Sequence, residues 1–107
     1  MSQAFQKEVL EQLRENGSDI TMPHKFEFYI YVATKNAADK AAEKIRNSGF
    51  SGAKVTRSAS GSGWLCLASK KIVPEQADLA DHASFCEQIA AALGGEFDGW
   101  EAEIVEN

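Results

Sequence analysis

The stretch KFEFYIYV, residues 25–32, is the clearest structural signal in this sequence. Its even positions are all apolar: Phe26, Phe28, Ile30 and Val32. Its odd positions are charged or amphipathic: Lys25, Glu27, Tyr29 and Tyr31. A period of two predicts a β-strand, because successive side chains of a strand point to opposite faces. We therefore expect one face of this strand to lie on a core and the other face to be amphipathic.

Segments of helical and strand character surround this strand. Apolar residues at helical spacing predict helices over residues 4–15, 36–48 and 79–93, and glycines directly follow each of them or lie close behind. Further strands are predicted over residues 53–58, 64–69 and 100–105. The glycine- and serine-rich stretch 60–63 joins two of them as a loose hairpin, and Asp98-Gly99 is interpreted as a turn before the last strand.

The order of these elements is one helix followed by β-α-β-β-α-β, which is the split βαβ pattern of ferredoxin-like domains. We expect an α+β fold in which two helices cover one face of a four-stranded antiparallel sheet, with an additional N-terminal helix. The apolar row of residues 26–32 should face those helices. A chain of 107 residues has the length of one ordinary domain, so residues 1–107 are expected to form a single domain.

Composition and charge limit the classes of function. The chain has 16 acidic and 11 basic residues, for a net charge of -5, which disfavours contact with phosphate backbones. Neither a signal peptide nor a membrane-spanning stretch is expected from the pattern of apolar residues. Two cysteines do not form a disulfide framework. We expect a cytoplasmic protein with free thiols.

The residues that most often carry chemistry do not form a catalytic or metal-binding pattern. His24 and His82 have no ligand at metal spacing, so both are expected to lie at the surface or on a helix flank. Cys66 and Cys86 are expected to be small buried hydrophobes. We therefore predict no catalytic residue, no cofactor and no metal.

Three carboxylates provide the one enzymatic alternative. Glu101 and Glu103 share a face of the predicted last strand, and Glu27 is on the expected neighbouring strand. Such a cluster can perform acid–base chemistry if it is buried. Charged side chains are rarely buried without a partner, so we expect the three to be solvated.

The aromatic residues suggest a binding surface. Tyr29 and Tyr31 project from the open side of the sheet, and Trp64 is expected to share that face. Aromatic side chains on such a face can stack RNA bases, so RNA binding is a hypothesis. The RNA-recognition signature is absent, however, and the nearby glutamates oppose it. We favour an arrangement in which the N-terminal helix covers both tyrosines with its apolar stripe of Phe5, Val9 and Leu13.

Two patches at the ends of the predicted fold resemble a known family. The first is LRENGSD, residues 13–19, and the second is GGEFDGWE, residues 94–101. A Gly-Ser-Asp turn after an opening helix, together with an Asp-Gly-Trp turn into a last strand, is similar to the RraB family of regulators of ribonuclease E activity. The resemblance implies a non-enzymatic bacterial regulator that binds ribonuclease E, damps its cleavage of RNA and alters which proteins join the RNA-degrading assembly.

The resemblance and the charge together imply where a protein partner binds. Named members of the family carry a long acidic C-terminal tail, whereas this sequence ends at Asn107, so it resembles a short member without the tail. An acidic surface steers toward basic partner segments. Self-association through the open sheet or an edge strand is an alternative. The partner-binding residues that we predict are Asp19, Glu27, Tyr29, Tyr31, Trp64, Asp98, Trp100, Glu101 and Glu103.

Overall fold

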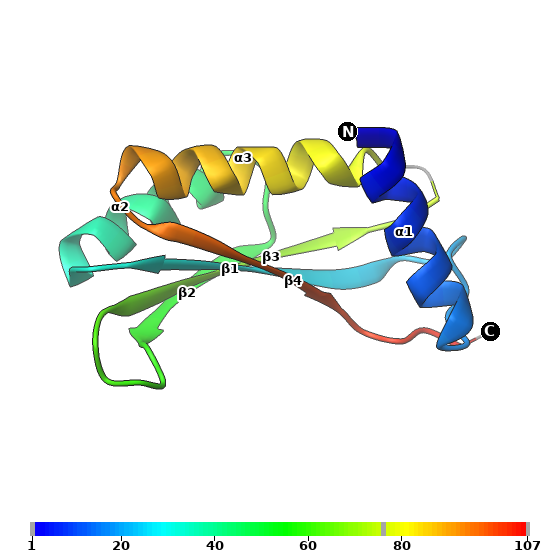
Figure 1. Cartoon of the computed structure of the whole chain (residues 1–107), viewed down its shortest axis with the longest axis horizontal. Helices are drawn as coiled ribbons and strands as arrows, with labels where there is room; N and C mark the ends of the chain where they lie inside the picture. Colours follow the sequence, from blue (N-terminus) through cyan, green and yellow to red (C-terminus); the bar gives the residue numbers. More distant parts are fainter. Residues whose placement is uncertain (1, 76, 107) are drawn as a thin grey trace.

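The computed structural model describes residues 2–75 and 77–106 of the chain, and the side chains of residues 6–75 and 77–106. Its elements follow one another as α1 (Ser2–Glu15), β1 (His24–Val32), α2 (Lys35–Arg46), β2 (Gly52–Arg57), β3 (Trp64–Ile72), α3 (Leu79–Ala92) and β4 (Glu96–Ala102) (Figure 1). The order of elements matches the prediction. β3 continues three residues beyond its predicted end, and β4 begins and ends earlier than predicted.

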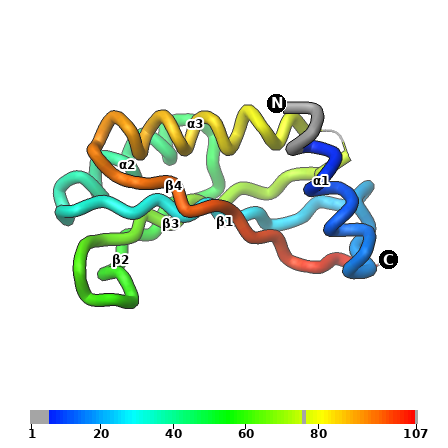
Figure 2. The backbone as a smooth tube through the Cα atoms, viewed as in Figure 1, coloured from blue at the N-terminus to red at the C-terminus, as the bar shows by residue number. Residues whose placement is uncertain are grey.

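The four strands form one antiparallel sheet in the order β2-β3-β1-β4. β1 is a central strand, paired with β3 along its whole length and with β4 on the other side. α2 and α3 pack on the same face of the sheet, and α1 lies beside α3 at one end of it (Figure 2). The predicted α+β class and the antiparallel four-stranded sheet are therefore confirmed.

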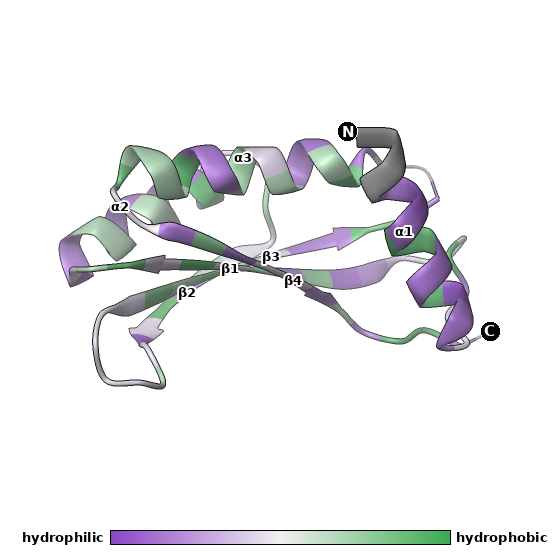
Figure 3. Cartoon of the chain, in the orientation of Figure 1, coloured by the Kyte–Doolittle hydropathy of each residue, from purple (hydrophilic) through white to green (hydrophobic). Residues whose placement is uncertain are grey.

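The core lies between the sheet and the layer formed by α2 and α3. The apolar row of β1 faces these helices, as predicted, and its four side chains are 0–5% exposed. α2 contributes mostly alanines to this layer: Ala38, Ala41 and Ala42. Small side chains let the helix approach the sheet closely, whereas β1 supplies Phe26, Phe28 and Ile30, which are among the largest fully buried side chains. Each such side chain contributes about 1.5–3 kcal/mol when fully buried. Figure 3 shows hydrophobic positions along α3 and mainly hydrophilic ones along α1.

β4 differs from the prediction because Asp98-Gly99 is a β-bulge within the strand, not a turn before it. Phe28 pairs with Trp100 and Ile30 pairs with Phe97, so two residues of β4 lie opposite one residue of β1. Gly99 has φ +97°, a conformation that side chains with a Cβ rarely adopt. An Asp-Gly pair suits both a turn and a bulge, so the dipeptide alone does not distinguish them.

The bulge changes which side chains of β4 reach the core. In a regular strand, residues three apart point to opposite faces. Here Phe97 and Trp100 both pack on β1, with ring centroids 6.4 Å from Phe28 and 5.7 Å from Phe26, respectively. The earlier expectation that Trp100 marks the start of the strand is wrong, since β4 begins at Glu96.

α1 does not cover the tyrosines, which corrects the arrangement that we favoured. Its buried side chains, Val9 and Leu13, join the core at the end of the helical layer, where α1 packs on α3. Gln6 fixes this contact, since its Oε1 accepts the Leu79 N–H at 2.9 Å at the start of α3. The side chain of Phe5 lies outside the described residues. The stripe of α1 is thus buried against a helix rather than on the sheet.

Candidate interaction surface

The face of the sheet opposite α2 and α3 is uncovered in the part of the chain that the structure describes. We call it the open face. Strand register assigns to it the residues Lys25, Glu27, Tyr29 and Tyr31 of β1, Leu65, Leu67, Ser69 and Lys71 of β3, Lys54 and Thr56 of β2, and Glu96 and Glu101 of β4. Asp98, exposed in the bulge, and Glu103, just after β4, extend the β4 side of this face.

The centre of the open face is apolar and two strands wide. Tyr29 lies directly opposite Leu67, and Tyr31 lies directly opposite Leu65. All four side chains are half-buried. Cross-strand neighbours of this kind contact one another on the surface of a sheet, so the four form a continuous patch. The alternation of apolar and polar residues in β1 predicted that the two tyrosines face the open side of the sheet. It did not predict that the two leucines lie there as well.

The β4 side of the open face is acidic. Glu101 lies opposite Glu27, and Glu96 lies opposite Tyr31. With Asp98 in the bulge and Glu103 beyond the strand, four carboxylates follow one another along this side of the face, and all four are exposed. The structure therefore brings four of the predicted acidic residues, Glu27, Asp98, Glu101 and Glu103, together with the two tyrosines, and Glu96 joins them without having been predicted.

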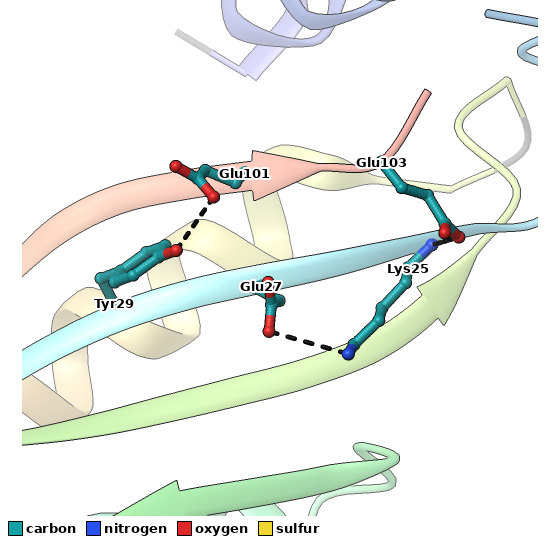
Figure 4. Close-up of polar contacts among 5 residues, drawn as sticks. All are labelled: Lys25, Glu27, Tyr29, Glu101 and Glu103. Atoms are coloured by element: carbon teal, nitrogen blue, oxygen red, sulfur yellow. Dashed lines mark hydrogen bonds and ion pairs between the residues drawn. The ribbon is translucent and has the colours of Figure 1, made fainter. Parts of the chain in front are cut away.

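Contacts within the sheet hold several of these groups in place (Figure 4). The Tyr29 hydroxyl donates to Glu101 Oε2 at 3.0 Å, and the Lys25 backbone N–H donates to Glu103 Oε2 at 2.7 Å. Lys25 Nζ lies 3.8 Å from Glu27 Oε2. The hydrogen bond to the Glu101 carboxylate, with smaller contributions from burial and from neighbouring negative charge, raises the pKa of Tyr29 above 10.0. The phenol accordingly stays a donor at neutral pH.

The two tryptophans do not lie on the open face. Trp64 pairs with Val32, whose side chain is buried under the helices, and the Arg57 guanidinium carbon lies 5.2 Å from the centre of the Trp64 ring. Trp100 packs on Phe26 on the same side of the sheet. The expectation that Trp64 shares the face of the tyrosines is therefore wrong, because Leu65 rather than Trp64 lies opposite Tyr31.

Asp19 belongs to a different part of the molecule, the loop between α1 and β1. Its Oδ1 accepts the Thr21 hydroxyl at 2.6 Å and the Thr21 N–H at 3.0 Å, and these bonds hold the pKa of Asp19 below its ordinary value. Its backbone N–H donates to Val105 O at 2.6 Å. Ser18 and Asp19 of the Gly-Ser-Asp motif thus accept hydrogen bonds from backbone N–H groups of Val105 and Thr21, and the predicted role of Asp19 in partner binding stays a prediction.

His24 is completely buried, contrary to the expectation of a surface histidine. Its Nδ1 lies 2.7 Å from Met22 O, which can only accept, so Nδ1 carries the proton. Its Nε2 shares a hydrogen bond of 2.9 Å with the Ser18 hydroxyl, as the acceptor when the imidazole is neutral, and Ser18 Oγ accepts the Val105 N–H at 2.8 Å. The histidine is a structural link between the loop before β1 and the segment after β4.

The thiols and carboxylates do not form a reactive arrangement in the described residues. Cys66 and Cys86 are buried, as predicted, and burial raises the pKa of their thiols to about 11 and about 12. Both are therefore protonated and poorly nucleophilic at neutral pH. Glu101 and Glu103 are exposed and Glu27 is half-buried. No group of three His, Cys, Asp or Glu residues in the described part of the chain could hold a metal ion.

A family model described as regulator of ribonuclease activity B matches residues 3–102, which is nearly the whole chain. No curated protein matches the chain at a significant level. Among the described residues, every helix is too short or too polar to traverse a lipid bilayer.

Proposed function

This chain belongs to the RraB family of regulators of ribonuclease activity, as its Gly-Ser-Asp and Asp-Gly-Trp motifs predicted, and on this premise we propose that it is a non-catalytic regulator that binds ribonuclease E and lowers its cleavage of RNA. The family match over residues 3–102 carries this proposal. We place the contact on the open face and the activity in the bacterial cytoplasm. In this proposal the protein regulates the ribonuclease by binding to it and not by catalysing a reaction.

The distribution of polar and apolar groups supports a binding role. A patch with an apolar centre and a charged rim has the anatomy of a protein interface. On the open face, the half-buried centre of Tyr29, Tyr31, Leu65 and Leu67 lies beside the carboxylates of β4. Ribonucleases that hold RNA need basic segments, and those segments are complementary to such carboxylates.

We also infer a ferredoxin-like topology for residues 1–107 as one domain. Read from the β4 edge, the strand order is β4-β1-β3-β2. β3 thus lies between the two strands of the first β-α-β unit, and β1 lies between those of the second, which is the split arrangement of that fold. Measured contacts between backbone amides that place β1 at an edge of the sheet would contradict this inference.

A cleavage assay tests the proposed function. Purified ribonuclease E acts on a labelled RNA with and without excess protein, and the proposal expects slower cleavage with the protein present. A pull-down with the immobilised protein, at low and at moderate salt, then tests direct contact. Retention of the enzyme at low salt that weakens with salt is the expected result. If the enzyme is retained at neither salt concentration, the proposal fails.

RNA binding is the second candidate, because the structure leaves Tyr29 and Tyr31 uncovered. The neighbouring strand presents Leu65 and Leu67 instead of aromatic side chains, and the carboxylates of β4 repel phosphates, so we rank it below protein binding. A gel shift with short single-stranded RNA at low salt separates the two. A shift that is lost in Tyr29→Ala and Tyr31→Ala supports RNA binding, whereas the absence of a shift dismisses it.

A further inference from the structure

Most charged side chains of the open face lie on its two sides, with Lys25 and Glu27 of the central strand β1 between them. Carboxylates occupy the β4 side, and they are Glu96, Asp98, Glu101 and Glu103. Lysines occupy the opposite side. Lys54 of β2 lies opposite Leu67 of β3, and Lys71 is also on β3. The apolar patch lies between the two sides. Positively charged groups of a partner lying across this face are therefore attracted to the β4 side and repelled by the lysines on the opposite side.

Addition of an extended strand to the β4 edge does not suit this structure. Strand addition needs a regular row of free backbone N–H and C=O groups along an edge. β4 contains the Asp98-Gly99 bulge, and its exposed side chains are acidic. Bulges and charged side chains are the devices with which proteins prevent pairing at an edge strand. The open face is therefore a better surface for a partner than the β4 edge.

The apolar patch has the dimensions of one side of a helix. Adjacent strands lie about 4.8 Å apart, so two strands with their side chains offer a stripe roughly 10 Å wide, which is about the diameter of an α-helix. Tyr29 and Tyr31 are two residues apart on β1, which corresponds to roughly 6.6 Å. Apolar side chains four residues apart on a helix lie about 6 Å from each other, so they match this spacing.

We propose that the open face binds an amphipathic helix of the partner whose apolar side rests on Tyr29, Tyr31, Leu65 and Leu67 and whose basic residues lie along the β4 side. This inference rests on the proposed function in taking the partner to be a protein, and it specifies the chemistry of the segment that is bound. Glu96 and Glu101 receive the basic side chains. Lys54 repels basic side chains on the other side of the face. A helix with basic residues along both of its sides therefore binds with one unfavourable contact, at Lys54.

A synthetic helix provides a probe that does not require the ribonuclease. The probe is a fluorescently labelled peptide of about 18 leucine and lysine residues arranged with one apolar side, a length at which such helices can form. The control is a peptide of the same composition with the order scrambled. Anisotropy at about 0.15 M salt, where long-range attraction is screened, measures both dissociation constants. The amphipathic peptide is expected to bind at least about tenfold more tightly than the scrambled one.

Charge reversals of matched size locate the contact. Glu96→Lys should weaken binding of the amphipathic peptide about fivefold, because it removes an attraction and adds a repulsion. Glu87→Lys makes the same change of net charge at an exposed position of α3 and should change affinity by less than about twofold. Lys54→Glu should tighten binding about threefold. Leu67→Ser should weaken it about tenfold through loss of apolar contact, with circular dichroism as the check on folding.

Three results would overturn the inference. The first is equal affinity of the amphipathic and scrambled peptides, and the second is an equal effect of Glu96→Lys and Glu87→Lys. The third is a dimer in sedimentation that Leu67→Ser converts to a monomer, because a second copy would then occupy the open face. If the peptide binds as expected but ribonuclease E is not retained, the proposed function fails alone. If the ribonuclease is retained equally by Glu96→Lys and the unchanged protein, the location on the open face fails alone.

Discussion

Replacement of Gly95 by alanine is expected to destabilise the protein more than replacement of the glycine in β2, Gly52, or of the glycine in β4, Gly99. Gly95 lies between α3 and β4, where the backbone passes directly over the end of β1. A Cβ built at this position would lie 2.7 Å from Val32 Cγ1 and 3.2 Å from the carbonyl carbon of Tyr31, and closer still to the Tyr31 carbonyl oxygen. A side chain could rotate away from such a contact, but the backbone of a central strand cannot.

The size of the effect follows from what must move. Extra methyl groups in packed regions cost about 1–3 kcal/mol, and a contact with backbone of β1 places Gly95→Ala near the upper end, about 3 kcal/mol. Gly99→Ala meets no atom within 4 Å, but its φ of +97° imposes roughly 1–2 kcal/mol of strain. Gly52→Ala has neither a clash nor a positive φ, so it should be neutral or stabilise by up to about 1 kcal/mol.

Urea unfolding of the three variants, followed by circular dichroism, measures this series. For a chain of this length, about 3 kcal/mol corresponds to a fall of roughly 10–20 °C in Tm, so thermal unfolding gives an independent reading. The expected order of stability is Gly52→Ala, then Gly99→Ala, then Gly95→Ala. A Gly95→Ala variant within about 1 kcal/mol of the unchanged protein would show that β4 does not cross β1 as closely as described.

Three further predictions concern the buried polar groups and the open face. Ser18→Ala should cost about 1–3 kcal/mol in urea unfolding, because it leaves a buried imidazole nitrogen and a backbone N–H without their partner. The thiols of Cys66 and Cys86 have folded-state pKa values of about 11 and about 12, above the ordinary 9.0, so the unfolded chain loses these protons first. Stability should therefore be unaffected by them below pH 9.0 and should fall as the pH rises from there toward 12, a loss that replacement of both cysteines by alanine would reduce in urea titrations. Glu101→Gln should lower the pKa of Tyr29 toward 10.0, since the carboxylate is the main cause of its elevation, and ultraviolet titration of the phenolate measures the change.

The central strand could be predicted from the sequence, whereas its neighbours could be predicted only in part. β1 has one face on the core and one outside, so its side chains alternate cleanly between apolar and polar types. β3 begins with Trp64-Leu65-Cys66-Leu67, which is apolar on both faces. Local alternation cannot then decide which side chains face the core, and a shift of one residue exchanges the two faces. This is why Trp64 was placed on the wrong face.

The positions of α1 and His24 could not be predicted from the sequence, because they depend on contacts between distant parts of the chain. The stripe of α1 had to be buried, but the sequence offered both the sheet and α3 as surfaces for it. Gln6, whose side chain caps the start of α3, favours the second surface, and nothing near it in sequence reveals this. His24 likewise lies against Ser18 because of the loop that joins them, and its partner Ser18 binds Val105 from the opposite end of the chain.

The two motifs that resemble the family act together on a single strand, although they are far apart in sequence. Asp98-Gly99 introduces the bulge that turns both Phe97 and Trp100 toward the core, so Glu96 on one side of the bulge and Glu101 on the other both remain on the open face. The Gly-Ser-Asp motif binds Val105 through two hydrogen bonds and thereby anchors the chain just after β4. The bulge determines which side chains of β4 face the core, and the two hydrogen bonds to Val105 fix the chain just after the strand. The row of carboxylates on the open face is thus a consequence of both motifs, and a change in either should disturb the proposed contact with a partner without removing any residue that touches it.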